Sequence, residues 1–458
     1  MALKLFNTLT RKKEVFKPIK NKTAGVYTCG PTVYWYQHIG NLRSYIFSDI
    51  LKRVLLYDGY KVKHVMNVTD VGHLTSDADE GEDKIEKAAQ KEHKNAKEIA
   101  EYYLKIFKED FKKLNIIEPN VWSKATEHIA EQIELIKKLE KNGFTYKTSD
   151  GIYFDTSKMK DYGKMANLKN QKLEAGKRID LGEKKNITDF ALWKFSPSTD
   201  SGQAKRQQEW NSPWGIGFPG WHIECSAMSM KHLGEHFDIH TGGIDHIPVH
   251  HTNEIAQNEG ATGHKVVNFW IHGEFLTSAG EKISKSKGGL FTLSELEEKG
   301  FNPMAFRYLM FTAHYRTPLN FSLQALQEAQ NGYERLNNII SEIKDDKKIN
   351  KKYLEEFEKA IDNDLDMPKA LSVLWKMLRD QKAIGKIKTI AEMDKVFGLD
   401  LLKKEELKIP QEVEKLINER ETARKNKDFN KSDELRDKIK ELGYLVEDTI
   451  EGQKIKKI

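Results

Sequence analysis

The two cysteines of this 458-residue chain, Cys29 and Cys225, lie in segments whose residue types suggest metal or thiol chemistry. Cys29 follows the apolar stretch 25–27, and Cys225 ends the segment 219–225, shortly before a histidine-rich stretch that ends at Glu254. A cysteine thiolate acts as a metal ligand or as a nucleophile. Thiols this far apart in sequence share one site only if the intervening chain folds back, so we expect two halves of the chain to meet there.

Side chains that could complete a metal site follow Cys225. His250 and Glu254 are four residues apart, so both would face the same way on a helix. Zinc takes cysteine, histidine and carboxylate ligands in tetrahedral geometry, so these two residues with Cys29 and Cys225 form one candidate ligand set. Residue type alone leaves other histidines open as ligands, namely His240, His246 and His251. The structural alternative is that the buried cysteines only pack in the core.

The segment 38–41, His-Ile-Gly-Asn, is a candidate phosphate site because it falls between a predicted strand and a predicted helix. Backbone N–H groups and the helix dipole favour phosphate at such a place. Gly40 would allow a ligand close to the backbone, and His38 and Asn41 can donate to phosphate oxygens. The alternative interpretation is a turn with an incidental histidine.

A second candidate phosphate element is the segment 282–286, Lys-Ile-Ser-Lys-Ser, which Lys-Gly-Gly follows. On a loop, Lys282 and Lys285 would suit a pyrophosphate clamp, since a lysine is a point charge that can close on developing negative charge. A solvated basic loop is the structural alternative.

These residues need a scaffold, and the first part of the chain predicts an α/β fold. The stretches 25–29 and 62–69 read as buried strands on either side of a helix over 42–57, which makes a parallel unit. A single long helix is predicted over 83–114. The strand pattern returns at 237–240 and 266–271 after a stretch of short strand-like pieces and polar loops. We therefore expect one α/β domain that is interrupted by an insertion.

The later part of the chain predicts a different architecture. From Thr292 onward the sequence reads as almost all helical, and Thr292 begins a capping-box pattern. Pro410 marks a break, after which a small basic region begins.

Composition excludes several classes of protein. The formal net charge of +6 and the pI of about 8.8 permit a polyanionic partner on one face, but they are not typical of a protein that coats nucleic acid. The chain has no apolar run long enough for a membrane span and no signal-peptide pattern at its start. Two cysteines do not make a disulfide framework, so reduced thiols and a cytoplasmic location are expected.

The two phosphate elements resemble the HIGH and KMSKS signatures of class I aminoacyl-tRNA synthetases, in that order. Beyond these signatures, the chain resembles the cysteinyl-tRNA synthetase family over essentially its whole length. The segments that carry this resemblance are 25–41, 67–70, 212–215, 219–228, 253–257 and 423–429.

The resemblance implies a Rossmann-type catalytic domain with a parallel sheet, split by an insertion, then a helical bundle and an anticodon-binding domain. The implied boundaries are 1–117 and 216–290 for the catalytic halves, 118–215 for the insertion, 291–322 for a linker fold that contacts the tRNA stem, 323–405 for the bundle and 406–458 for the anticodon domain. The implied reaction joins L-cysteine to tRNA(Cys) with ATP by way of cysteinyl-adenylate. It implies one zinc ion per subunit to recognise the cysteine thiolate, Mg²⁺ with ATP, and a monomer with no membrane partner.

The resemblance also assigns roles to individual residues. The zinc ligands are Cys29, Cys225, His250 and Glu254. The catalytic residues are His38, Asn41, Lys282 and Lys285, and the ATP-binding residues are His38, Gly40, Asn41, Asp245 and Lys285. The amino-acid pocket contains Cys29, Gly30, Thr69 and Trp221, and the anticodon contacts are Arg424, Phe429, Asp433 and Asp448.

The chain departs from the family pattern at three positions of interest. Asn41 stands where the first signature often has its second histidine, Val249 replaces a proline before the proposed ligand His250, and Phe429 stands where the family often has tryptophan. Two rival functions remain open at this point. One is a paralogue that ligates cysteine to an amino-sugar, against which the region after Pro410 argues. The other is a catalytically silent RNA-binding paralogue, against which the intact lysines and ligand candidates argue.

Overall fold

The computed structural model describes residues 2–72, 83–167, 183–196, 206–278, 281–282, 291–403, 410–449 and 452–457. The chain divides into two compact units, Met1–Leu401 and Leu402–Ile458. Within the described residues, no helix combines the length and the apolar character needed to cross a membrane.

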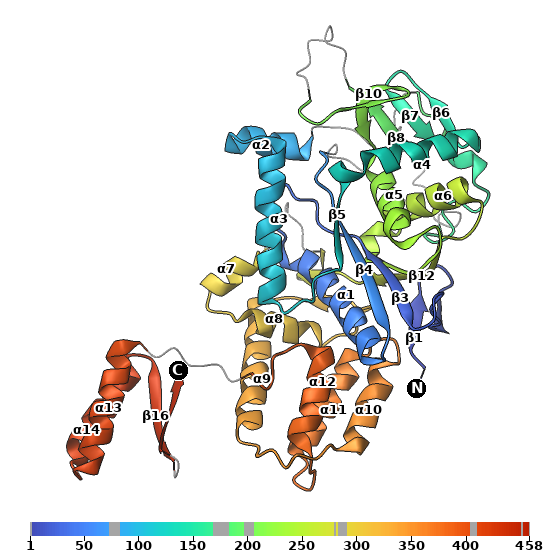
Figure 1. Cartoon of the computed structure of the whole chain (residues 1–458). Coiled ribbons are helices and arrows are strands. Elements are labelled where there is room, and N and C mark those ends of the chain that lie inside the picture. The colour runs from blue at the N-terminus through green and yellow to red at the C-terminus, as the bar shows by residue number, and fades with distance from the viewer. Residues whose placement is uncertain are drawn as a thin grey trace. The chain divides into compact units, whose positions relative to one another are not determined.

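A five-stranded parallel sheet forms the centre of the first unit (Figure 1). Its strand order is β12 (Val267–Gly273), β11 (Phe237–Gly243), β3 (Thr23–Thr28), β4 (Lys61–Val68) and β5 (Val121–Lys124). All four neighbouring pairs are parallel. This sheet confirms the predicted α/β class with a Rossmann-type parallel sheet.

Alternation of buried side chains along the strands explains why both faces of this sheet are covered. On β3, Val26 packs into one hydrophobic cluster and the next residue, Tyr27, packs into another. Such two-sided burial is typical of parallel strands, whose crossover helices cover both faces. Helix α1 (Ile39–Tyr57) contacts β4, β11 and β12, and helix α5 (Trp221–Leu233) contacts β3 and β4. Helix α6 (His250–Thr262) packs on α5 and on α4 (Ile129–Lys141).

The predicted single helix over 83–114 is wrong, because the structure has two helices there. Helix α2 (Lys84–Glu92) ends at His93, whose φ of 54° is left-handed, and α3 (Ala96–Lys113) begins after Asn95. Asn95 and Glu98 form a capping box that satisfies the first N–H groups of α3. This Asn-x-x-Glu pattern is a helix-start signal inside an otherwise continuous apolar periodicity.

A second, antiparallel sheet lies in the region predicted as an insertion. Its strand order is β6 (Thr145–Lys147), β7 (Gly151–Phe154), β8 (Phe190–Phe195), β10 (Gly215–Pro219) and β9 (Trp210–Ser212). Sheet membership differs from the predicted boundaries at both ends. Strand β5 belongs to the parallel sheet although it follows residue 118, and β10 extends past residue 215.

Shorter elements connect these sheets to a helical bundle. They are β1 (Lys4–Asn7), β2 (Lys12–Val15), β13 (Leu276–Ser278), β14 (Glu281–Lys282), β15 (Leu319–Asn320), α7 (Leu293–Glu298) and α8 (Pro303–Met310). The bundle follows with α9 (Leu323–Ser341), α10 (Lys351–Ile361), α11 (Met367–Arg379) and α12 (Lys386–Phe397), as Figure 1 shows. The contact of α12 with α1 joins the bundle to the sheet domain.

The second unit contains α13 (Gln411–Lys425), α14 (Phe429–Glu441), β16 (Tyr444–Thr449) and β17 (Gly452–Lys457). The two strands form an antiparallel hairpin, so the expectation of an almost all-helical chain after Thr292 fails at the C-terminus. Val446 and Ile439 pack with Val413 in a small separate core. Short strands that are rich in charged residues carry a weak sequence signal, which explains the error.

Candidate active site

The candidate site lies where the parallel sheet changes its direction of growth. From β3 the chain adds β4 and β5 on one side, and later β11 and β12 on the other side. Ligands in open α/β sheets bind at the carboxyl ends of the strands at such a switch point. Cys29 directly follows β3, and Gly243 ends β11. A cavity of about 290 Å³ opens here, lined by residues of the first signature region and by side chains from α5 and α6.

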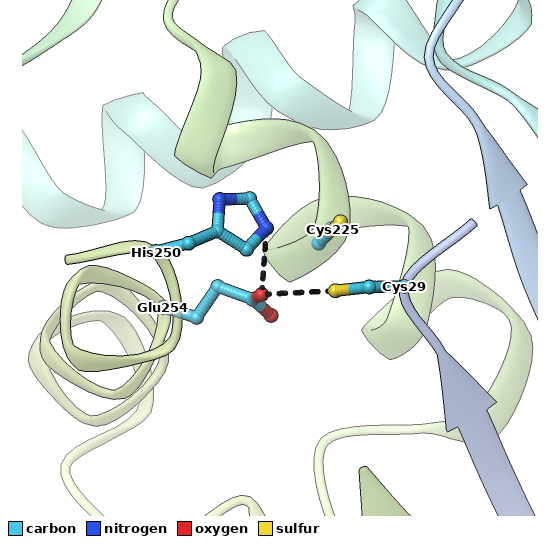
Figure 2. Close-up of side chains that lie close together, drawn as sticks. All are labelled: Cys29, Cys225, His250 and Glu254. Carbon is cyan, nitrogen blue, oxygen red and sulfur yellow. Dashed lines mark hydrogen bonds and ion pairs between the residues drawn. The ribbon is translucent and has the colours of Figure 1, made fainter. Parts of the chain in front are cut away.

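Four buried side chains lie close together, as Figure 2 shows, and three of them, Cys29, Cys225 and His250, line this cavity. One ligand atom from each of Cys29, Cys225, His250 and Glu254 lies within 4.8 Å of all the others. His250 Nε2 is 3.1 Å from Glu254 Oε1, and the same oxygen is 4.0 Å from Cys29 Sγ. Zinc bonds of about 2.0–2.3 Å place tetrahedral ligand atoms roughly 3.3–3.8 Å apart, so modest movements would suit a metal ion.

The structure also contains an overlapping candidate set, in which His240 and His251 replace Cys225 and His250. Cys29, Cys225 and His250 line the cavity, whereas His240 and His251 do not and are both fully buried. A metal that meets a substrate needs an open coordination position. The cavity therefore favours the set that contains Cys225 and His250 for a metal that contacts the substrate. It also favours His250 over His240 and His251, which residue type left open as ligands.

The ionisation of the four groups fits a cation site. Burial raises the pKa of the Cys29 thiol well above its usual range, and neighbouring Cys225 adds to the effect. Burial acts in the same direction on Cys225, but the hydrogen bond with Cys29 and the nearby His250 outweigh it and lower that pKa to about 7. Burial likewise opposes ionisation of Glu254, yet His240 and His250 bring its pKa down to about 2.

The compensating positive charge is on His250. Burial by itself lowers the pKa of this imidazole, but its hydrogen bonds to Cys225 and Glu254 raise it to about 10. The cluster therefore concentrates negative charge in a buried place and balances it with a proton. A divalent cation would supply that balance instead, with His250 neutral and both thiols ionised.

A second layer of histidines surrounds the four candidate ligands. His222 Nδ1 lies 2.9 Å from His250 Nδ1, and His240 Nε2 lies 2.9 Å from Glu254 Oε2. Outer partners of this kind fix the orientation of metal ligands. Sequence reasoning missed His222, although its i, i+3 spacing from Cys225 on one helix was a usable signal.

A chain of hydrogen bonds extends from Cys29 to the N-terminal part of the fold. His251 Nε2 is 3.1 Å from Cys29 Sγ, and His251 Nδ1 is 2.7 Å from His272 Nε2. His272 Nδ1 is in turn 2.8 Å from Thr8 Oγ1. With the thiolate as an acceptor, each ring accepts at Nδ1 and donates at Nε2, so the chain has one consistent direction. Sequence reasoning missed Thr8 and His272, which no spacing pattern links to the cysteines.

The residues predicted to form the pocket for the substrate amino acid lie beside the four candidate metal ligands. Gly30 donates its N–H to Asn67 Oδ1 at 2.7 Å, and a Cβ on Gly30 would lie 1.8 Å from the backbone oxygen of Asn67. Only glycine fits there. Thr69 Oγ1 donates to Glu224 Oε2 at 2.9 Å, and the Trp221 ring lies 4.7 Å from the His250 ring.

The predicted phosphate residues lie at the start of α1. His38 is the N-cap: its Nδ1 accepts from Asn41 N, and Asn41 Oδ1 accepts from His38 N, both at 3.3 Å. A Cβ on Gly40 would meet Nδ1 of His38 at 2.9 Å. Asp245 lies on the cavity wall, in the turn after β11. The amide of Asn41 therefore has a structural partner in addition to its proposed ligand.

Of the second signature, 282–286, the structure describes only Lys282. Lys282 lies in β14, whose partner is β13, and Lys285 lies outside the described residues. Phe291, the first described residue after the motif, accepts a hydrogen bond at 2.9 Å from the N–H of Ile39. A backbone hydrogen bond therefore joins the chain that follows this motif to the first signature.

The four predicted anticodon residues lie in the second unit. Asp448 accepts from Arg420 at 2.9 Å through both carboxylate oxygens, and Arg424 Nη1 lies 2.9 Å from the same carboxylate. Asp433 pairs with Arg436 at 3.2 Å on α14. Phe429 is 60% exposed at the start of α14. Phe429 is thus available to a partner, whereas Asp448 already holds two arginines.

Comparison with known proteins adds to this geometry. The family model described as the class I (C) tRNA synthetase catalytic domain matches residues 15–331. The model described as the cysteinyl-tRNA ligase anticodon binding domain matches residues 408–455. The first match lies in the first compact unit and the second match lies in the second unit.

Curated relatives match over nearly their full length. A cysteine–tRNA ligase 1 of Burkholderia lata is 48% identical to this chain, and the match covers 99% of this chain and 97% of that protein. A cysteine–tRNA ligase of Treponema denticola is 46% identical, with 98% of each chain covered. Among solved structures, Mycobacterium tuberculosis methionyl-tRNA synthetase with methionyl-adenylate has a TM-score of 0.57 at 14% identity, covering 82% of this chain and 88% of that one. This last likeness shows the fold alone.

The identity to these relatives and the two matching domain models agree with the parallel sheet and with the buried Cys/His/Glu cluster. The chain therefore belongs to the family of the cysteine–tRNA ligases, which are class I aminoacyl-tRNA synthetases.

Proposed function

We propose that this protein activates L-cysteine with ATP and transfers it to tRNA(Cys). A carboxylate oxygen of cysteine attacks the α-phosphorus of ATP, the bond to the bridging oxygen breaks, and pyrophosphate leaves. A hydroxyl of the 3′-terminal adenosine of the tRNA then attacks the carbonyl carbon of the adenylate, and AMP leaves. The observation that carries this proposal is a buried set of two thiols, an imidazole and a carboxylate, of which the thiols and the imidazole line a cavity, in a member of this family.

The choice of cysteine over serine rests on the donor set. A zinc ion held by Cys29, Cys225, His250 and Glu254 supplies a thiophilic centre that prefers a thiolate to a hydroxyl. A pocket that relied on shape alone would reject so similar a side chain poorly. Trp221, whose ring packs on His250, supports this ligand and closes one wall of the pocket.

The nucleotide belongs at the other end of the cavity. The N-terminus of α1 offers N–H groups and a partial positive charge to the phosphates, and His38 adds a donor at that helix end. Asp245 would bind the adenosine side, and Mg²⁺ would accompany ATP. Lys282 and Lys285 would bring positive charge to the departing pyrophosphate, where charge develops in the transition state.

The second unit favours transfer to tRNA over the amino-sugar alternative. Its match to an anticodon-binding domain gives it a purpose that a small acceptor does not require. Two free, buried cysteines are consistent with action in the reducing cytoplasm. We take the acting form to be a monomer, with ATP, L-cysteine and tRNA(Cys) as its ligands and no membrane partner.

Two measurements on the purified full-length protein test the proposal. We expect cysteine-dependent exchange of pyrophosphate into ATP, weak exchange with serine, and charging of a tRNA(Cys) transcript with cysteine. Absence of exchange would favour the silent RNA-binding alternative. Exchange without charging, together with transfer of cysteine to an amino-sugar, would favour the paralogue.

A further inference from the structure

Four aromatic side chains form a continuous cluster next to the cavity, and we call it the aromatic platform. Its members are Trp35, Tyr36, Tyr102 and Tyr103. The ring centroids of Trp35 and Tyr36 are 5.6 Å apart, those of Tyr36 and Tyr103 are 5.2 Å apart, and those of Tyr102 and Tyr103 are 5.1 Å apart. The platform therefore joins the segment just before the first signature to helix α3.

Only part of the platform serves the core. Tyr103 is 4% exposed and donates to Glu92 at 2.5 Å, so it holds the corner between α2 and α3. In contrast, Trp35 is 37% exposed and Tyr102 is 42% exposed. An isolated exposed aromatic ring is ordinary, but two of them joined through packed neighbours beside a cavity form a candidate binding surface.

Lysines lie over the two exposed rings. The Nζ atom of Lys91 is 5.2 Å from the centre of the Trp35 ring, and that of Lys94 is 4.4 Å from the centre of the Tyr102 ring. Lys94 also pairs with Glu92 at 2.9 Å, which offsets part of its charge. Aromatic faces with adjacent cations are the chemistry that binds single-stranded nucleic acid, because the rings stack on bases and the cations meet phosphates.

The platform is continuous with the proposed reaction site. Trp35 and Tyr36 line the same cavity as Cys29 and His38. Lys84, at the start of α2, lines it too. A single strand that lies across the platform can therefore pass directly into the cavity.

We propose that the aromatic platform binds the single-stranded 3′ end of the tRNA and guides its terminal adenosine to the adenylate. Trp35 and Tyr102 stack on bases, and Lys91 and Lys94 contact phosphates. Stacking tolerates any base, so this surface contributes affinity and position, while identity is read elsewhere on the tRNA. This inference rests on the proposed charging of tRNA.

The test combines protein variants with shortened RNA. The probes are a tRNA(Cys) transcript and the same transcript without its 3′ single-stranded nucleotides. For the unaltered protein, we expect trimming to weaken binding. In Trp35→Ala and Tyr102→Ala, the affinity for the full transcript should fall about fivefold to fiftyfold. Removing the 3′ nucleotides should then weaken binding to these variants much less than it weakens binding to the unaltered protein. Trp35→Phe should restore most of the loss, because it keeps a stacking face.

A matched control removes an exposed apolar side chain elsewhere. Leu56, near the end of α1, is 43% exposed, and Leu56→Ala should behave as the unaltered protein with both RNAs. Equal sensitivity to trimming in Trp35→Ala and in the unaltered protein would overturn the platform. The platform would also be overturned if Trp35→Ala raised the KM for ATP in pyrophosphate exchange more than it raised the KM for tRNA in charging. That result would mean that Trp35 binds ATP.

These outcomes are separate from those of the proposed function. If the unaltered protein neither exchanges pyrophosphate with cysteine nor charges tRNA, the proposed function fails. If it does both while the platform variants keep the KM for tRNA and the sensitivity to trimming of the unaltered protein, the platform alone fails.

Discussion

The Nε2 atom of His251 lies 3.1 Å from the Sγ atom of Cys29, at the start of a hydrogen-bond chain that runs through His272 to Thr8. His251 belongs to the overlapping ligand set but does not line the cavity. We interpret it as a donor to the Cys29 thiolate that positions this ligand without binding the substrate-facing metal.

His251→Gln should weaken zinc binding by about 10- to 100-fold, which is the usual effect of losing an outer partner. Titration with a competing chelator gives the affinity directly. His236→Gln is the matched control, because His236 is an exposed histidine that bonds Asn268 Oδ1 at 2.9 Å. Unchanged zinc affinity in His251→Gln would show that the chain of histidines does not act on the metal site.

Cys225→Ser should lose zinc stoichiometry and nearly abolish cysteine activation, because a serine hydroxyl stays protonated and is a poor ligand. The same substitution separates the two overlapping ligand sets. If zinc sits between Cys29, His240, His251 and Glu254 instead, Cys225→Ser keeps the metal and His251→Gln loses it. Metal analysis of the two purified variants decides between the sets.

The sequence predicted the scaffold well where burial is continuous. The strands at 25–29 and 62–69 and the helix at 42–57 correspond to β3, β4 and α1, because apolar runs with clear periodicity leave few alternatives. The break at His93 and the terminal hairpin were missed, since local capping and weakly apolar strands decide them.

The candidate active site was less predictable from the sequence than the scaffold was. Spacing related His250 to Glu254, and residue type made the two cysteines their candidate partners but left three other histidines open. The family resemblance then selected one set of four. No sequence pattern indicated that His272 and Thr8 continue the hydrogen-bond chain from Cys29, because contacts between distant strands depend on the register of the folded sheet. The same limit hid the aromatic platform, whose rings come from a loop and from α3.

Asp448 should stabilise the second unit, and this contribution should depend on pH. Its hydrogen bond with Arg420 and the charge of Arg424 lower the pKa of the Asp448 carboxyl below its usual range. A folded-state pKa below the unfolded value of about 3.9 gives stability that is complete above pH 4 and is lost as the pH falls through the folded pKa. Arg420 is fully buried, so Asp448→Asn leaves its charge poorly paired at all pH values above that range.

Hydrogen-exchange protection of residues 410–449 in the full-length chain measures this effect. Because the Asp448 side chain is 37% exposed, solvent screening reduces the loss to about 1–3 kcal/mol. Asp433→Asn is the control, since its pair with Arg436 is exposed on both sides and should contribute little. Equal protection in Asp448→Asn and Asp433→Asn would contradict a structural role for Asp448.

Phe429 should act on tRNA and not on stability, because its side chain is 60% exposed at the start of α14. Phe429→Ala should raise the KM for tRNA(Cys) in charging by about 5- to 100-fold, the range expected for one stacked base at about 1–3 kcal/mol. Phe429→Trp should restore or improve on the original value, since it enlarges the stacking face. Leu445→Ala, which truncates another exposed apolar side chain of the same unit, should change neither the KM for tRNA(Cys) nor the stability.

Pyrophosphate exchange should persist in Phe429→Ala, because the proposed activation site lies within Met1–Leu401. A lower melting temperature with an unchanged KM for tRNA would instead make Phe429 a packing residue and remove it from the anticodon assignment.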